Sequence, residues 1–209
     1  MREKIDCFLP CADIADLAET IGDLSASKTV QHIHLLTGDA TNINNIPQGV
    51  ELLETRHPLS TDAILQIAER TDAEYVLIST KPTPVRLGQH SLERFLRVAA
   101  DANAAMVYSD HYSVVEGTVV RHSVIDYQKG SVRDDFDFGQ LVLVNASLLH
   151  EYAATPPVHK YAHAGLYDLR LFLSRKGEIF HINEYLYTEE ELDNRKSREK
   201  QFDYVNPRN

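Results

Sequence analysis

The chain has 209 residues, of which 43% are hydrophobic and 25% charged, enough for one domain with a large core or at most two small ones. Acidic side chains outnumber basic ones, 31 to 21, and this argues against nucleic acid or an anionic membrane surface as the partner. No apolar run approaches the roughly 20 residues that cross a bilayer, and the start of the chain is charged rather than apolar, so we expect a cytoplasmic protein without a transmembrane segment.

The first part of the chain alternates strand-like and helix-like patterns. A short apolar run from Asp6 to Leu9 stops at Pro10 and predicts a strand, and apolar residues recur with helical spacing from Asp13 to Leu24. Ser60 is placed to cap a second helix, which reaches Arg70. Further strands are predicted at His32–Leu36, Val50–Leu53 and Glu74–Ser79. The last of these is almost continuously apolar, as is typical of a strand buried in a parallel sheet.

The second part of the chain contains a hairpin signal and a charged tail. The pattern predicts a hairpin from Val114 to Val120 that turns at Glu116-Gly117, whereas residues 121–138 lack periodicity. The other elements predicted here are a helix at Gln89–Ala100, strands at Ala105–Ser109, Leu141–Val144 and Glu178–Ile182, and a helix around Tyr167–Leu171. We expect a single domain over residues 1–188 and a charged C-terminal extension over residues 189–209, beyond which the natural protein could continue.

The β-α-β-β-α-β order of the first half predicts an open α/β sheet. In such sheets, ligands bind beyond the carboxyl ends of the strands, at loops that here contain Pro10-Cys11, Thr37 to Asp39 and Thr80 to Pro84. His32 and His34 alternate along one strand, and we expect both to face solvent.

Several short motifs occur in the same order as in a known family. They are the strand ending in Leu9-Pro10, the run Ala73–Ser79, the run Met106–Asp110, and Tyr167-Asp168-Leu169 with the following strand to Tyr187. Together they resemble the catalytic domain of family 2 glycosyltransferases. The resemblance implies a GT-A fold, which is a Rossmann-like, mixed and mostly parallel sheet flanked by helices. It also implies transfer of a sugar from a nucleoside diphosphate sugar to a hydroxyl of a glycan or lipid-linked acceptor.

The donor site implied by the resemblance lacks its usual metal ligands. Family members hold Mg²⁺ or Mn²⁺ with a D-x-D motif after the fourth strand, but residues 79–83 here are Ser-Thr-Lys-Pro-Thr. Either Lys81 and Arg86 bind the diphosphate directly, or a metal ion comes from elsewhere, or donor binding is degenerate and Lys81 is an ordinary solvated side chain. Asp110 is a candidate ligand for donor or metal, and its alternative role is to cap a turn. The full set of expected donor-binding residues is Pro10, Thr37, Asp39, Lys81, Arg86 and Asp110.

The catalytic base of the family is also displaced. Inverting members carry an acidic pair before the Tyr-Asp-Leu motif, where this chain has Gly165-Leu166. Asp168 is the nearest acid and our first candidate base, although two positions along a helix turn its side chain about 200° away. Its alternative roles are to cap the helix or to pair with Arg170 or Arg175.

The densest acidic cluster runs from Arg133 to Gly139. Asp135 is our second candidate catalytic residue, and a resemblance to the acceptor side of the family's site adds Arg133, Asp134 and Asp137. Three carboxylates interleaved with two aromatic rings could bind a cation or a sugar, or could simply form an acidic surface loop.

Two functions from different classes fit these observations. The first is a hexosyl-type glycosyltransferase, and the second is a catalytically inactive GT-A-like module that binds a nucleotide or glycan. A nucleotidyltransferase is disfavoured because no glycine-rich basic loop follows the first strand. Cys7 and Cys11 lack the second pair of a zinc site, so we expect reduced, partly buried thiols.

Overall fold

The computed structural model describes residues 3–38, 40, 43, 45–130, 136–155, 157 and 159–190. The predicted site residues Asp39, Arg133, Asp134 and Asp135, and the tail from residue 191, lie outside this part of the chain. The strands are β1 (Ile5–Pro10), β2 (Val30–Thr37), β3 (Val50–Glu54), β4 (Tyr75–Ser79), β5 (Val85–Leu87), β6 (Met106–Val115), β7 (Thr118–His122), β8 (Leu141–Asn145) and β9 (Ile179–Glu190). The helices are α1 (Ala18–Ala26), α2 (Thr61–Arg70), α3 (Ser91–Asp101), α4 (Ala146–Ala154) and α5 (Gly165–Lys176). None of the described helices is long and apolar enough to cross a membrane.

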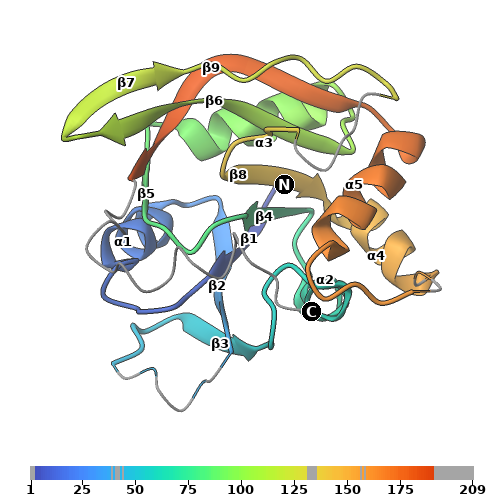
Figure 1. The fold of residues 1–209 in the computed structure, drawn as a ribbon, viewed down its shortest axis with the longest axis horizontal. Helices are drawn as coiled ribbons and strands as arrows, with labels where there is room; N and C mark the ends of the chain where they lie inside the picture. Colours follow the sequence, from blue (N-terminus) through green and yellow to red (C-terminus); the bar gives the residue numbers. More distant parts are fainter. Residues whose placement is uncertain are drawn as a thin grey trace, which may run out of the picture.

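The described strands form one sheet in the order β3-β2-β1-β4-β8-β6-β9-β5, with β7 paired to the outer part of β6 (Figure 1). Strands β1 to β4 are mutually parallel, β8 runs antiparallel between β4 and β6, and β9 is parallel to β6. This mixed sheet, flanked by helices on both faces, confirms the predicted GT-A or Rossmann-like fold class.

Each face of the sheet carries its own hydrophobic core. Helices α1 and α3 pack on one face, where Phe95 is among the fully buried side chains. Helices α2, α4 and α5 pack together on the other face, around residues such as Ile64, Leu149 and Leu169 (Figure 1). The loops at the carboxyl ends of the strands are therefore held by layers on both sides.

Several local predictions are confirmed. The Ser60 hydroxyl accepts a hydrogen bond from the Ala63 N–H and caps α2. The β6–β7 hairpin turns at Glu116 and Gly117, whose φ angles of 50° and 77° give the left-handed backbone of a tight two-residue turn. Both cysteines are free, and both are buried rather than partly buried.

Other local predictions differ from the structure. Helix α1 begins at Ala18 instead of Asp13, because the Asp13 carboxylate accepts a hydrogen bond from the Ala15 N–H and holds a turn there. His34 is only 4% exposed, stacked on Phe8, so the prediction that it faces solvent is wrong. Helix α4 and strand β5 were not predicted. Strand β9 continues to residue 190, past the predicted boundary at residue 188.

Candidate functional site

A cavity of about 390 Å³ lies at the carboxyl ends of β1 and β4, where the predicted ligand-binding loops meet. It is lined by Pro10, Cys11, Ala12, His57, Pro58, Leu59, Thr80, Pro82, Ala162 and His163. A neighbouring cavity of about 740 Å³ reaches Gly38 and Arg56, and both cavities share His57 and Ala162. We call the first of these the rim cavity.

One wall of the rim cavity is built from two segments about a hundred residues apart in the chain. The Thr61 N–H donates to the Tyr161 carbonyl at 2.9 Å, and the Leu166 N–H donates to the Leu59 carbonyl at 3.1 Å. The rings of His57 and His163 meet edge to face with centroids 4.6 Å apart. These contacts hold the wall in place before any ligand binds.

Lys81 lies next to this cavity and forms an ion pair with Glu189, a residue predicted from the sequence to belong to the charged C-terminal extension. Its Nζ is 2.7 Å from the Glu189 Oε2, and Glu189 is only 6% exposed. The other carboxylate oxygen accepts a hydrogen bond from the Gln140 N–H at 2.8 Å and lies 3.3 Å from His111 Nε2. The half-exposed Lys81 side chain is therefore held at the rim by Glu189.

Gln140 fixes the loop that takes the place of the D-x-D motif. Its side chain is fully buried, and its Nε2 donates to the Thr83 carbonyl at 2.7 Å and to the Ser79 hydroxyl at 3.1 Å. The Thr83 hydroxyl donates to Gln140 Oε1 at 3.1 Å. The Tyr187 hydroxyl accepts from the Gln140 N–H at 2.8 Å. Sequence reasoning missed this network, although the alternation of Tyr187 and Glu189 along one strand face was a usable signal.

A histidine pair extends the network away from Lys81. The ring of His111 stacks between His122 and Tyr187, with centroids 4.4 and 5.1 Å away. Burial lowers the pKa of His111, and the nearby Glu189 opposes this only in part. Asp137, a predicted acceptor-side residue, accepts from His122 Nε2 at 2.9 Å and from Gly139 N–H at 2.8 Å. Burial raises the pKa of Asp137, but these hydrogen bonds outweigh it and the pKa is lowered overall.

Asp110 lies level with the rim but does not line the cavity. Its Oδ1 accepts from the Val124 N–H and from His181 Nε2, both at 2.9 Å, and Asp110 is buried. His181 Nδ1 lies 2.6 Å from the exposed Asp126. These contacts tie the segment after β7 to the sheet, and a role of Asp110 in binding donor or metal stays a prediction.

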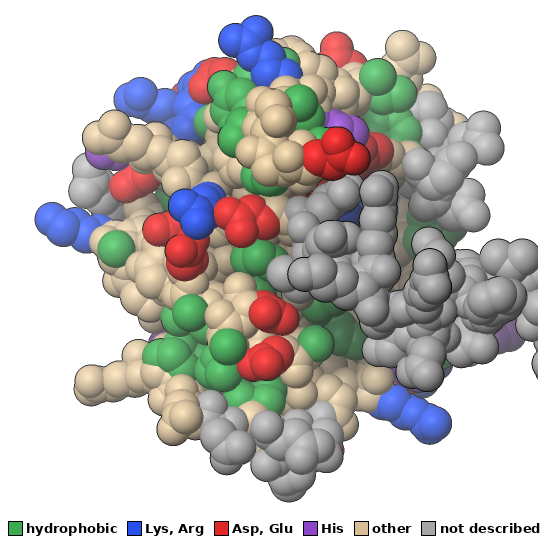
Figure 2. All heavy atoms as spheres, turned by 60° about the vertical axis from the view of Figure 1, so that its left-hand side comes forward, with side chains coloured by type: hydrophobic (Ala, Val, Ile, Leu, Met, Phe, Trp, Pro, Cys, Tyr) green, Lys and Arg blue, Asp and Glu red, His purple; other side chains and the backbone are tan. Residues whose placement is uncertain are grey.

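The remaining donor residues are spread along the rim. Pro10 lines the cavity and Thr37 is buried at the end of β2, whereas Arg86 on β5 pairs with Glu19 and Glu190, each at 2.6 Å. The hydrogen bond to Glu190 is the main cause of the raised pKa of Arg86. On its described part, the face in Figure 2 shows acidic side chains beside single basic ones rather than a continuous basic patch.

Asp168 is held by a neighbouring helix. Its Oδ2 accepts a hydrogen bond from the Tyr152 hydroxyl of α4 at 2.8 Å. Burial, and then Asp168 itself, raise the pKa of Tyr152, so this hydroxyl remains a donor. Asp168 lines neither cavity, and its role as a base stays a prediction.

We expect Tyr152→Phe to lower the free energy of unfolding by about 1 kcal/mol, because it removes one charged hydrogen bond from the α4–α5 contact. Urea denaturation measures the change. Tyr112→Phe is the matched control, since the Tyr112 ring packs in a tilted arrangement against Tyr185 but its hydroxyl makes no hydrogen bond with a described residue, and it should leave stability unaltered. Equal stabilities of the two variants would contradict the assigned contact.

The residues around the rim cavity do not fit the family's cation site. The lining set contains no carboxylate among the described residues, and an ammonium group stands where the D-x-D motif would be. Mg²⁺ prefers oxygen ligands, usually with at least one carboxylate. We therefore derive no step through a metal at this site.

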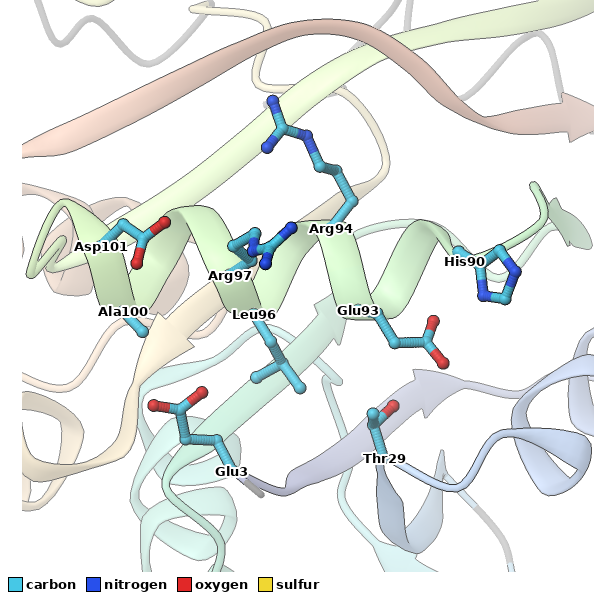
Figure 3. A pocket seen from close by; sticks show the side chains of 9 residues that line it. All are labelled: Glu3, Thr29, His90, Glu93, Arg94, Leu96, Arg97, Ala100 and Asp101. Carbon is cyan, nitrogen blue, oxygen red and sulfur yellow. The ribbon is translucent and has the colours of Figure 1, made fainter. Parts of the chain in front are cut away.

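A third cavity, of about 620 Å³, lies beside α3, and its side chains do not resemble those of the rim cavity (Figure 3). It is lined by acids and bases together, including Glu3, Glu93 and Arg97. Arg94 points away from Thr29 in Figure 3 and pairs with Glu184 of β9. The mixed charge of this third cavity gives no preference for one class of ligand.

Comparisons with known proteins bear on the fold. No protein-family model matches the chain, and no curated protein matches its sequence. S. aureus TarS 1-349, solved in complex with UDP-GlcNAc, is similar in structure, with a TM-score of 0.61 and 13% identity over 91% of this chain and 59% of TarS. The 4-diphosphocytidyl-2C-methyl-D-erythritol synthase of Anaerococcus prevotii has a TM-score of 0.53 and 12% identity over 88% of both chains.

The bifunctional IspDF of Campylobacter jejuni is also similar, with a TM-score of 0.50 and 11% identity over 87% of this chain and 50% of that one. The chain thus spans about half to three fifths of the length of two of these relatives. At such low identities the likenesses show the fold alone. What the chain shares with these proteins is the fold, a mixed and mostly parallel sheet flanked by helices.

Proposed function

We propose that the chain is the donor-binding domain of a glycosyltransferase that uses a nucleoside diphosphate sugar. The observation that carries the proposal is the rim cavity at the carboxyl ends of β1 and β4, with Lys81 held beside it by Glu189. Ligands of open α/β sheets bind at this edge. TarS, which has the same fold, is solved with UDP-GlcNAc and with UDP.

In this proposal, Lys81 contacts the diphosphate in place of a divalent cation. A lysine is a compact point charge with three donors, and the Lys81 side chain is half exposed. The pair with Glu189 positions the ammonium and lets it turn toward a phosphate. Pro10, Thr37, Asp39, Arg86 and Asp110 are the further candidate donor-binding residues.

Transfer would form a bond between an acceptor hydroxyl oxygen and the anomeric carbon and break the bond from that carbon to the diphosphate. The acceptor proton would pass to a carboxylate, for which Asp168 and Asp135 are the candidates. Arg133, Asp134 and Asp137 are the candidate acceptor-side residues, with a glycan or lipid-linked acceptor.

A second function, a non-catalytic module that binds a nucleotide or glycan, is favoured by one specific contact. The Tyr152 hydroxyl already donates a hydrogen bond to Asp168 Oδ2, and Gly165 and Leu166 have no acidic side chain that could act as the base instead of Asp168. The transferase requires nucleotide binding at the rim cavity and turnover, whereas the module requires only that a nucleotide or a glycan binds there.

Calorimetry with UDP, CDP and GDP, with and without Mn²⁺, tests the proposal. We expect one of them to bind equally well in both conditions, and Ala162→Trp to weaken that binding at least about tenfold, since a large side chain there would fill the cavities that the exposed Ala162 lines. Ala154→Trp is the matched control, because Ala154 is exposed at the end of α4 and lines neither cavity.

The outcomes separate the candidate functions. Binding of no nucleoside diphosphate would overturn the proposal, and binding that needs Mn²⁺ would remove Lys81 from the role given to it. Slow hydrolysis of the matching nucleotide sugar would identify a transferase, and Asp168→Asn would then show whether this acid is the base. Binding without hydrolysis or transfer would favour the non-catalytic module.

A further inference from the structure

Three side chains with metal-binding atoms converge at the amino-terminal edge of the sheet, opposite the rim cavity. Asp6 lies in β1, His32 in β2, and Asp72 in the loop before β4. Asp6 Oδ1 is 3.0 Å from His32 Nδ1, which is 3.5 Å from Asp72 Oδ1, and all three atoms lie within 4.8 Å of one another. In the described part of the chain, no other three His, Cys, Asp or Glu residues come together in this way.

We infer that Asp6, His32 and Asp72 form a binding site for a divalent transition-metal ion of the Zn²⁺ class. Zn²⁺ takes imidazole nitrogen and carboxylate oxygen at about 2.0–2.2 Å in a tetrahedron, which places ligand atoms roughly 3.3 Å apart. The two distances that involve His32, 3.0 and 3.5 Å, bracket this value. The ion therefore fits between the three atoms with only small side-chain rotations.

The Asp6 carboxylate is oriented as a metal ligand is. It is fully buried, and its Oδ2 accepts hydrogen bonds from the N–H groups of Asp72 and Ala73, at 3.0 and 3.2 Å. These bonds hold one oxygen and aim the other, Oδ1, at His32. Metal-binding carboxylates are characteristically fixed by such outer hydrogen bonds.

The charge and exposure of the cluster also suit a cation. Two carboxylates face one imidazole, and among the described residues His32 is the only basic group within ion-pair distance of either acid. The His32 and Asp72 side chains are 42% and 69% exposed, so a hydrated ion can enter from solvent. Water would supply the fourth ligand, and the Gln31 Nε2 donates a hydrogen bond to Asp72 Oδ1 at 2.6 Å.

A metal here would be structural rather than catalytic. Asp6 and Pro10 lie near opposite ends of β1, so the ion would sit at the far edge of the sheet from the rim cavity. It would join β1, β2 and the loop entering β4, which are far apart in the chain. The site does not depend on the proposed nucleotide-sugar function.

Titration of tag-free protein with Zn²⁺ by calorimetry, without nucleotide, tests this inference. We expect one ion per chain and a higher thermal unfolding temperature with Zn²⁺. Co²⁺ should give the absorption spectrum of a four-coordinate ion. Asp72→Ala removes an exposed ligand and leaves the backbone N–H that holds Asp6, and His32→Gln retains a donor for Asp6. Each variant should bind Zn²⁺ at least about tenfold more weakly.

Asp16→Ala is the matched control, since it removes an exposed carboxylate near the opposite edge of the sheet. It should retain wild-type affinity. Circular dichroism establishes that each variant is folded. The inference is overturned if wild-type protein binds no Zn²⁺ without nucleotide, or if both cluster variants bind it as tightly as the control.

Discussion

Replacing Gly165 with alanine is expected to lower the free energy of unfolding by about 3 kcal/mol, because the first residue of α5 is pressed against the backbone at the start of α2. A Cβ at this position would overlap the peptide group that joins Ser60 and Thr61, and it would lie 2.6 Å from the Ser60 carbonyl oxygen. Backbone atoms cannot rotate away as a flexible side chain can. Either α5 or the capped start of α2 must therefore shift, and urea denaturation measures the cost.

Gly22→Ala is the control for this prediction. Gly22 lies in α1, and a Cβ there meets no atom within 4 Å. Alanine has the higher helix propensity, so this variant should be as stable as wild type or gain up to about 1 kcal/mol. A Gly165→Ala protein that unfolds at the wild-type urea concentration would show that the two helices are not in close contact.

The close packing of Gly165 also concerns the acidic pair that precedes the Tyr-Asp-Leu motif in family 2 glycosyltransferases, which this chain resembles in sequence. Gly165 stands at the first position of the acidic pair that precedes the Tyr-Asp-Leu motif in that family. A glutamate at this position would place its Cβ inside the Ser60–Thr61 peptide group. The close approach of α5 to α2 therefore leaves no room for an acidic side chain at this position.

The parts of the fold that local chemistry determines were predictable from the sequence. The Ser60 cap, the Glu116-Gly117 turn and the buried strand β4 each depend on a few neighbouring residues. Helix α4 was not predicted, although Asn145 caps it by accepting a hydrogen bond from the Leu148 N–H. Its buried residues Ala146, Leu149 and Tyr152 have helical spacing, but Leu148, Ala153 and Ala154 place further apolar side chains outside that face, so the pattern is weak and burial against α2 and α5 decides its structure.

The candidate site was predictable only in its location. The strand order placed the rim loops together, and the cavity lies there. The partners of Lys81 could not be predicted, because they depend on β8 pairing with β4 and on β9 lying between β6 and β5. Charged residues at 189 and 190 suggested a solvated tail, but the sheet buries Glu189 beside Lys81.

Gln140→Leu is expected to lower the free energy of unfolding by about 3 kcal/mol and to weaken nucleotide binding. Leucine keeps a similar volume but leaves the Thr83 carbonyl and the Ser79 hydroxyl without the donor that Gln140 Nε2 supplies. Each buried polar group left unpaired costs about 1–3 kcal/mol. The loop from Thr80 to Pro82 lines the rim cavity, so its release should lower the affinity for a nucleoside diphosphate as well as the stability.

Urea denaturation and calorimetry on the same variants separate this network from a general loss of packing. Gln48→Leu, at an exposed position without a described hydrogen bond, should change stability by less than about 0.5 kcal/mol. Gln140→Glu keeps the shape of the side chain but removes both donor hydrogens and buries a charge near Glu189, so it should be at least as harmful as leucine. If both Gln140 variants were as stable as the Gln48 control, the loop would not depend on this side chain, and Lys81 would lose the rigid support that its proposed role at the diphosphate requires.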